Sequence, residues 1–229
     1  MTLLPKDNKL VVQDEKTGGN PLFPVFLKLN ALHTVLIGGG NVGLEKLTAL
    51  LQNSPEATVT IIAQNILPEV HVLAADYAGV NILQKSFADT DLDHADVVIA
   101  ATNDSELNKS IREAAHSRKL LINVADQPGL CDFYLGSIVK KGDLKIAIST
   151  NGKSPTFAKR FREVLEETLP ENLPELLNNL KWVRDSLSGD FKDKVDKLYE
   201  LTSVLKNKKE PLPTIHNERD YRSGTKKAV

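Results

Sequence analysis

Hydrophobic and polar residues follow two different patterns along the chain, and the pattern changes after Asp126. Before this residue, short apolar runs alternate with helix-length segments that carry apolar residues at helical spacing. The predicted strands are Thr34–Ile37, Thr58–Ala63, Val80–Leu83, Asp96–Ala101 and Leu120–Ala125, and the predicted helices cover 42–51, Leu67–Tyr77 and Asp104–Ser117. Strands that are apolar throughout and separated by helices are typical of a parallel sheet covered on both faces. We therefore predict an α/β fold with a Rossmann-like parallel sheet.

The second pattern predicts a β-hairpin followed by helices. Phe133–Val139 and Leu144–Ser149 are apolar stretches on either side of Lys140-Lys141-Gly142-Asp143, which is typical of a hairpin. The predicted helices run from Ser154-Pro155 to about Leu169, from about Pro174 to Leu187, and onward from Phe191, the last with Phe191, Val195, Leu198, Thr202 and Leu205 on one face. The fold after Asp126 is thus expected to be a hairpin and a C-terminal helical domain.

Composition and charge exclude several classes of protein. Apolar residues make up 41% and charged residues 26% of the 229 residues, as in ordinary globular proteins. The net charge of -1 argues against a surface devoted to nucleic acid or membrane. Cys131 is the only cysteine, which excludes disulfides within the chain and any cysteine-built metal site. The sequence shows neither a long apolar run nor a signal-peptide pattern, so we expect a cytoplasmic protein.

A glycine-rich turn follows the first predicted strand. Gly38-Gly39-Gly40-Asn41-Val42-Gly43 contains G-x-G-x-x-G between a strand and a helix, the setting in which this pattern binds dinucleotides. Gly38 would permit the tight turn, Gly40 the approach of a pyrophosphate, and Gly43 close packing of helix and strand. The helix N-terminus would attract the phosphates. The alternative is a tight turn in a fold that binds no nucleotide.

The end of the second predicted strand bears on the choice of cofactor. An Asp or Glu there commonly holds the ribose hydroxyls, and an Arg accommodates a 2′-phosphate. Here the strand ends in Gln64-Asn65, whose amides can hydrogen-bond a ribose, and it offers no arginine. We therefore expect NAD rather than NADP.

Asp126 follows the last predicted strand of the sheet, at the edge where open α/β folds bind ligands. A carboxylate there could accept a proton while a hydride passes to the cofactor. Equally, an Asp before Pro128-Gly129 could simply initiate a turn. The residues themselves leave both interpretations open.

Residues 139–162 carry seven basic groups against Asp143 alone, a net charge of +6. Within them, Ser149–Ser154 is similar to a phosphate-binding P-loop, but Ala147 stands where that loop requires glycine, so a nucleoside triphosphatase is not expected. The remaining features suit an anionic ligand: hydroxyls, an amide and basic side chains near one helix N-terminus. The residues of this candidate substrate site are Thr150, Asn151, Gly152, Lys153, Ser154, Lys159 and Arg160, with Arg162 close by. The alternative is a solvated charged face.

Several segments together resemble the precorrin-2 dehydrogenase/sirohydrochlorin ferrochelatase family, the NAD-dependent N-terminal part of siroheme synthase. The resemblance covers about residues 21–205. Its matching segments are Phe23-Pro24-Val25-Phe26, Gly38-Gly39-Gly40-Asn41-Val42, Ala100-Ala101-Thr102-Asn103-Asp104, Asn123-Val124-Ala125-Asp126, Cys131-Asp132-Phe133 and Ile146-Ala147-Ile148-Ser149-Thr150-Asn151-Gly152-Lys153-Ser154-Pro155. The last segment is the most specific, because many dehydrogenases share the glycine pattern.

This resemblance implies oxidation of precorrin-2 to sirohydrochlorin with NAD⁺ as hydride acceptor, and in some members insertion of ferrous iron. It places the catalytic aspartate at Asp126. The implied cofactor contacts are Asn41, Val42, Gln64 and Asn65, with Ala101 and Thr102 nearby. It also implies a homodimer in which the hairpin and following helix of one chain complete the other chain's cleft. The basic stretch would then bind a tetrapyrrole with eight carboxylates.

The chain departs from the family pattern at two positions. Gly136 stands where proline is usual, and Asn151 stands where glycine is usual. No histidine has a metal-ligand spacing, so we expect no bound metal and favour a dehydrogenase without chelatase activity. Two rival functions are a Rossmann dehydrogenase with another substrate and a non-catalytic NAD(H)-sensing module. A sensor would need no second basic surface.

The predicted domain organisation combines the pattern with the resemblance. Residues 1–20 are expected to form a flexible arm and 21–132 an NAD-binding Rossmann domain. Residues 133–169 would be the dimerisation segment, 170–206 a helical domain, and 207–229 a flexible tail. We expect neither a nucleic-acid nor a membrane partner.

Overall fold

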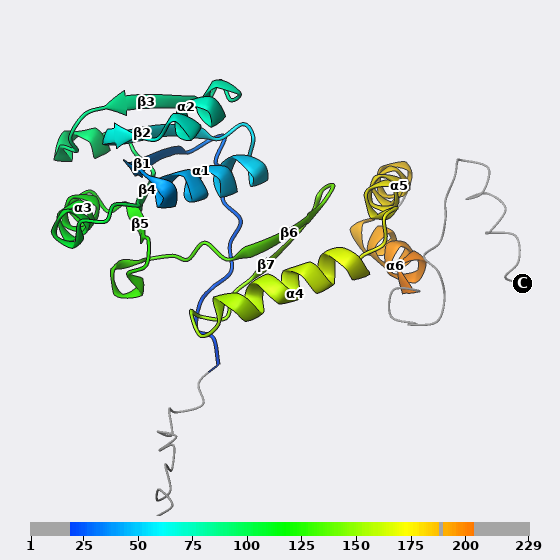
Figure 1. Ribbon diagram of the computed structural model, residues 1–229. Coiled ribbons are helices and arrows are strands. Elements are labelled where there is room, and N and C mark those ends of the chain that lie inside the picture. The colour runs from blue at the N-terminus through cyan, green and yellow to red at the C-terminus, as the bar shows by residue number, and fades with distance from the viewer. Residues whose placement is uncertain (1–18, 188–189, 204–229) are drawn as a thin grey trace, which may run out of the picture.

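A parallel sheet and its covering helices form the first part of the computed structural model, which describes residues 19–187 and 190–203 (Figure 1). The strands are β1 (His33–Gly39), β2 (Thr58–Ile66), β3 (Val80–Gln84), β4 (Val97–Ala100) and β5 (Leu121–Val124). The helices are α1 (Asn41–Asn53), α2 (Pro68–Ala75) and α3 (Ser105–Ser117), and the short 3₁₀ turns are η1 (Asp89–Leu92) and η2 (Pro128–Leu130). Each predicted strand and helix of this part is present, with ends shifted by a few residues at most.

The strand order is β3-β2-β1-β4-β5, and all four pairings are parallel. β1 is therefore central, and the chain reverses its direction of winding between β3 and β4. Ligands of open α/β sheets bind at the carboxyl ends of the strands beside such a reversal. The predicted Rossmann-like fold is confirmed.

Two hydrophobic cores lie on opposite faces of the sheet because successive strand residues point to opposite sides. Leu36 of β1 packs in one core with residues of α1 and α2. Val35 and Ile37 pack in the other core with residues of α3. Apolar side chains on both sides of β1 explain why its sequence shows no alternation.

Among the described residues, an antiparallel hairpin and three helices follow η2. They are β6 (Ser137–Lys141), β7 (Leu144–Ile148), α4 (Pro155–Thr168), α5 (Leu173–Ser186) and α6 (Phe191–Leu201). In Figure 1 the hairpin extends away from the sheet with α4 alongside, and α5 and α6 lie beyond its far end. The predicted hairpin and C-terminal helices are confirmed. The proposed division into domains stays a prediction, and residues 1–18, Leu205 and the tail lie outside the described residues.

The first hairpin strand begins later than its sequence predicts. Phe133–Gly136 was expected to be strand, but β6 starts at Ser137. The Phe133 carbonyl instead accepts a hydrogen bond from Asn123 Nδ2 at 2.8 Å, and the Tyr134 hydroxyl lies 3.5 Å from the Pro128 carbonyl. These contacts hold Phe133 against β5 and Tyr134 near η2, and residues 133–136 connect the sheet to the hairpin.

Candidate functional site

The glycine turn between β1 and α1 has the geometry that its sequence predicts. Gly38 has a φ of +121°, and a Cβ there would lie 2.3 Å from the Ala101 carbonyl oxygen. A Cβ on Gly43 would lie 2.1 Å from the Gly38 carbonyl oxygen. Both positions therefore require glycine. Gly38 needs it for its positive φ and for the close approach of Ala101, and Gly43 needs it for the close approach of Gly38.

Gly40 has a different environment from its two neighbours in the pattern. A Cβ there would meet no atom within 4 Å. Gly40 is the N-cap residue of α1 and gives the helix no side-chain cap. The start of α1 thus has open space beside its N-cap residue and no side chain capping its first N–H groups, which suits an anion at the positive end of the helix.

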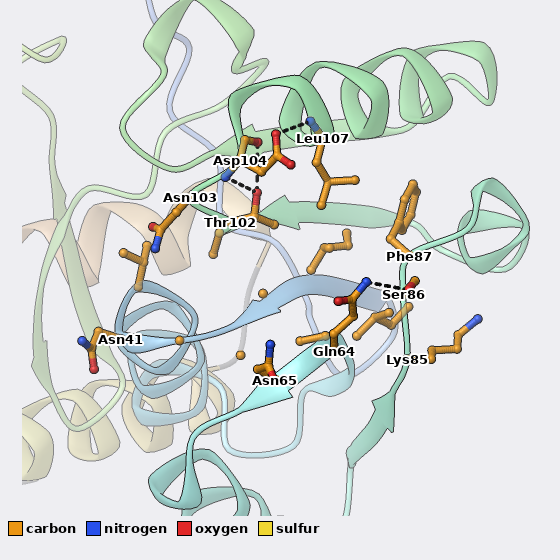
Figure 2. A pocket seen from close by; sticks show the side chains of 18 residues that line it. Asn41, Gln64, Asn65, Lys85, Ser86, Phe87, Thr102, Asn103, Asp104 and Leu107 are labelled. Atoms are coloured by element: carbon orange, nitrogen blue, oxygen red, sulfur yellow. Dashed lines mark hydrogen bonds between the residues drawn. The ribbon is translucent and has the colours of Figure 1, made fainter.

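A cavity of about 520 Å³ opens in front of this turn, at the carboxyl ends of β1, β2 and β4 (Figure 2). Eight of the nine predicted cofactor residues line it: Gly38, Gly40, Asn41, Val42, Gln64, Asn65, Ala101 and Thr102. Gly43 is the exception, since it acts by letting α1 pack close to β1. The wall also includes Lys85, Ser86, Phe87, Asn103, Asp104 and Leu107, which were not predicted.

Gln64 and Ser86 form one end of the cavity. Gln64 Nε2 donates to the Ser86 hydroxyl at 2.6 Å, as Figure 2 shows, and the Gln64 carbonyl accepts from Gln84 Nε2 at 3.1 Å. The contact from Gln84 is made to the Gln64 main-chain carbonyl, whereas the contact with Ser86 holds the exposed Gln64 side-chain amide at the end of β2. Its oxygen and the neighbouring Asn65 amide can serve a ribose, as the sequence predicts.

Thr102 and Asp104 form the other end, after β4. The Thr102 hydroxyl donates to Asn108 Oδ1 at 2.7 Å, while Asn108 Nδ2 donates to the Thr102 carbonyl at 3.1 Å. Asn108 is buried, so this reciprocal pair satisfies its amide away from water. Asp104 caps α3 by accepting from the Glu106 and Leu107 N–H groups at 2.9 and 3.0 Å. The loop after β4 is therefore fixed before any ligand binds.

Asp126 lies at the same edge of the sheet but is not one of the cavity-lining residues. Val124 pairs with Ala100 of β4, and the Ala125 N–H donates to the Ala100 carbonyl at 2.8 Å. Asp126 is the next residue, exposed and with a φ of +58°. Asparagine and aspartate are the residues besides glycine that tolerate this left-handed conformation best. The structure thus places the Asp126 carboxylate in the turn after β5, the strand that pairs with β4, and its catalytic role stays a prediction.

Cys131 closes the turn that carries Asp126. Its thiol donates to the Val124 carbonyl at 3.1 Å, and the Val124 N–H donates to Sγ at 3.2 Å. Burial raises the pKa of the Cys131 thiol above its ordinary value; the hydrogen bond from Val124 lowers it, and the Asp132 charge adds a smaller increase. A thiol that stays protonated is a poor nucleophile, so Cys131 has a structural role.

The basic stretch of residues 139–162 does not form a single surface. Lys140 Nζ donates to the Gln52 carbonyl at 3.1 Å, and Lys145 Nζ donates to the Asn53 carbonyl, so both cap the C-terminus of α1. Lys141 Nζ donates to the Leu169 carbonyl at 2.8 Å and pairs with Glu171. Three of the seven cations therefore hold the hairpin in place, which corrects the expectation that the whole stretch serves a ligand.

The predicted substrate loop joins β7 to α4. Ser154 Oγ accepts from the Phe157 N–H at 3.1 Å, which caps α4, and the Ser154 N–H donates to Thr150 Oγ1 at 3.1 Å. Lys153 and Lys159 are exposed, and exposed Arg160 pairs with Glu163 at 3.1 Å. None of the seven predicted substrate residues lines the cavity of its own chain.

The two departures from the family pattern have local explanations. Asn151 has a φ of +51°, a conformation that asparagine tolerates better than most residues. A Cβ on Gly136 would lie 2.6 Å from the Ile148 carbonyl oxygen, so glycine permits the hairpin strands to approach at this point. Neither departure disturbs the loop or the hairpin.

Within residues 19–187 and 190–203, no three His, Cys, Asp or Glu side chains come together as a metal site would need. In the same ranges, no helix has the length and apolar character to cross a membrane.

Two family models match consecutive parts of the chain. Residues 25–137 match the model described as "Putative NAD(P)-binding", and residues 141–168 match "Sirohaem biosynthesis protein central". Together they cover more than half of the chain: the sheet with its glycine turn, and the hairpin's second strand with α4.

Curated relatives and a solved structure agree with these matches. The siroheme synthase of Thioalkalivibrio sulfidiphilus is 37% identical over 144 residues, and that of Zymomonas mobilis is 40% identical over 143 residues. The matched regions cover 63% and 62% of this chain but only 29% and 30% of those proteins. The structure titled "SirC, precorrin-2 dehydrogenase" superposes with a TM-score of 0.68 over 90% of this chain and 100% of that one, at 22% identity. At this identity, the similarity to the solved structure shows a shared fold.

Proposed function

We propose that the chain oxidises precorrin-2 to sirohydrochlorin with NAD⁺ as the oxidant, because residues 25–137 match the NAD(P)-binding model and residues 141–168 match the sirohaem biosynthesis model. The observation that carries the proposal is the cavity at the glycine turn, on a chain whose next segment matches the sirohaem-specific model. Its relatives named siroheme synthase are more than three times as long as the matched region. The activity assigned to this chain is therefore that of one module.

The cavity fits a dinucleotide. Gly38 and Gly43 have no space for a side chain, whereas Gly40 faces open space at the start of α1. The N–H groups of Asn41 and Val42 would bind the pyrophosphate, and Gln64 and Asn65 would bind the adenosine ribose. When bound, the oxidised nicotinamide supplies the hydride acceptor. Ala101 and Thr102 form the wall on the side of β5 and Asp126.

Asp126 is the proposed base. Removing two hydrogens from precorrin-2 releases a hydride and a proton, and the proton requires an acceptor near the reacting carbon. The Asp126 carboxylate is exposed, and the turn that Cys131 closes carries it at the sheet edge next to β4. An ionised carboxylate there can take the proton and release it to water.

The substrate side is proposed to come from a second copy of the chain. Lys153, Lys159 and Arg160 would bind the carboxylates of the tetrapyrrole, yet they lie outside their own chain's cavity. Phe157 and Phe161 of α4 stack with ring centroids 5.8 Å apart and are 58% and 42% exposed. An exposed aromatic stripe beside a basic loop supports a homodimer in which each chain's α4 and hairpin complete the other chain's cleft.

We propose a cytoplasmic dehydrogenase without a resident metal, and ferrous iron would enter only as a second substrate. The experiment is anaerobic incubation of the protein with precorrin-2 and NAD⁺, with the tetrapyrrole spectrum and NADH absorbance recorded together. We expect sirohydrochlorin and NADH in equal amounts. NAD⁺ binding without turnover would contradict the enzyme and favour a sensing module, and a parallel sample with ferrous iron tests chelation.

A further inference from the structure

Lys85 stands beside the position where a dinucleotide's adenosine ribose would lie. It follows β3 directly, and its N–H donates to the Ala63 carbonyl at 3.0 Å, so its backbone pairs with the end of β2 next to Gln64. The end of the second strand is where Rossmann folds distinguish a ribose 2′-hydroxyl from a 2′-phosphate. Lys85 is the only cationic side chain among the residues that line the cavity. A lone cation at this place would by itself favour the phosphate.

Asp91 of η1 holds the Lys85 ammonium. The two form an ion pair in which the Asp91 side chain is only 10% exposed and the Lys85 side chain 44%. The second carboxylate oxygen accepts from the Ala88 N–H at 2.9 Å, which fixes the orientation of Asp91. Figure 2 shows the Lys85 side chain leading away from Gln64 rather than across the cavity. The cation is therefore both neutralised and turned away from the ribose position.

We propose that Asp91 sets a preference for NAD over NADP by holding Lys85 away from the ribose 2′ position. The inference rests on the proposed function only in taking the cavity as a dinucleotide site. A 2′-phosphate carries up to two negative charges and would meet a cation already paired with a carboxylate. A 2′-hydroxyl carries no charge and can bond to the Gln64 or Ser86 side chain. The preference thus arises without an acidic residue at the end of β2.

The test is direct titration of NAD⁺ and NADP⁺ against Asp91→Asn. The asparagine oxygen can still accept from the Ala88 N–H, while Lys85 loses its charged partner. We expect NADP⁺ to bind about three- to tenfold more tightly, as for a freed cation on an exposed phosphate. NAD⁺ affinity should change by less than about twofold, because the hydroxyl is neutral. The charge-matched control is Asp89→Asn, also in η1 but exposed, and it should change neither affinity.

A second variant tests whether a gain in NADP⁺ affinity comes from the freed Lys85 or from the loss of the Asp91 charge itself. In the double variant Asp91→Asn/Lys85→Gln, the gain in NADP⁺ affinity should disappear. A gain that persists in the double variant, or no gain in a folded Asp91→Asn protein, would overturn the inference. So would equal affinities for the two dinucleotides in the wild type. If the wild type binds neither dinucleotide, the assignment of the cavity as a cofactor site fails. If the wild type binds NAD⁺ but the variants leave both affinities unchanged, only the role of Asp91 fails.

Discussion

The described regions before and after Asp132 differ in how many of their hydrophobic residues one chain buries. Twenty-four hydrophobic residues before Asp132 are buried, whereas the described residues after it contain five: Val139, Ala158, Leu173, Leu176 and Val183. The first region holds two cores, one on each face of its sheet. In the second region, α4 leaves Phe157, Phe161 and Val164 exposed at helical spacing. The first region therefore buries the hydrophobic residues of its sheet within one chain, while α4 of the second presents a surface of the kind that binds another chain.

The two halves of the proposed site therefore come from different regions of the chain. The cavity depends on contacts made entirely within the sheet region, so a single chain forms it. The basic loop before α4 is fixed by its own hydrogen bonds but does not line the cavity at the glycine turn of its own chain. Binding of the cofactor and binding of the substrate should therefore respond separately to mutation.

Substitution of Asp126 should change turnover more than any other variant proposed here, and it should leave cofactor binding intact. Asp126→Asn keeps a side chain that tolerates a φ of +58° but removes the base. We expect dehydrogenase activity to fall by about 10²- to 10⁴-fold while NAD⁺ affinity stays within about twofold. Single-turnover measurement of NADH formation beside an NAD⁺ titration checks both values. Turnover at the wild-type rate would exclude Asp126 as the base.

The next effect tests whether the second region needs another chain. Phe161→Glu places a charge in the exposed stripe of α4, where it should prevent dimerisation and reduce turnover at least about tenfold without changing NAD⁺ affinity. Sedimentation velocity reports the assembly. The control is Val72→Glu, which changes an apolar residue that is 70% exposed on α2. This variant should leave dimerisation and turnover unchanged. A Phe161→Glu protein with wild-type mass and turnover would refute the role of this face.

Substitutions at Gly43 and Gly40 should change the free energy of unfolding in opposite directions. Both substitutions should weaken NAD⁺ binding. Gly43→Ala puts a Cβ 2.1 Å from the Gly38 carbonyl oxygen and should cost about 1–3 kcal/mol of unfolding free energy. Gly40→Asp supplies the N-cap that α1 lacks and should add about 0.5 kcal/mol, while its charge repels the pyrophosphate and weakens binding about tenfold. Thermal unfolding beside NAD⁺ titration checks the pair. A Gly40→Asp protein that binds NAD⁺ normally would contradict the assigned turn.

The smallest expected effect concerns the link between the regions. Lys140→Gln removes a cation from the C-terminal carbonyls of α1 and should lower the unfolding free energy by about 0.5–1 kcal/mol. Lys153→Gln removes an exposed cation that caps no helix and serves as the matched comparison. Chemical denaturation measures the free energy of unfolding of the Lys140→Gln and Lys153→Gln variants. Equal stabilities would mean that Lys140 contributes nothing to joining the hairpin to the sheet region.

The sequence predicted local structure and the site's local parts well, because those depend on nearby residues. Apolar runs marked β1, β4 and β5, and Ser154-Pro155 marked the start of α4, where Ser154 is indeed the cap. Gly38 and Gly43 could be assigned roles because a turn between a strand and a helix imposes fixed contacts. The Asp126 turn was located, although its left-handed backbone was not foreseen.

What the sequence did not reveal depends on contacts between distant segments. Lys85 and Ser86 reach the cavity only because β3 pairs beside β2, and neither belongs to a recognisable pattern. Asn108 reads as an ordinary helix residue, and its bond to Thr102 appears only when α3 packs after β4. Lys140 and Lys145 look like part of a ligand-binding stretch until the hairpin brings them to the end of α1. Position in the chain does not show which partner a charge will meet.

The central proposal is that one chain's cavity and another chain's basic loop form each site, and mixing two inactive variants tests it most directly. One variant is Asp126→Asn, and the other is Lys153→Gln/Lys159→Gln/Arg160→Gln. In a mixed dimer, one of the two sites receives both defects and the other receives neither. Equal mixing after dissociation and reassembly should restore about a quarter of wild-type turnover, because half of the dimers are mixed and each has one intact site. Activity no higher than the average of the two separate variants would contradict the shared site.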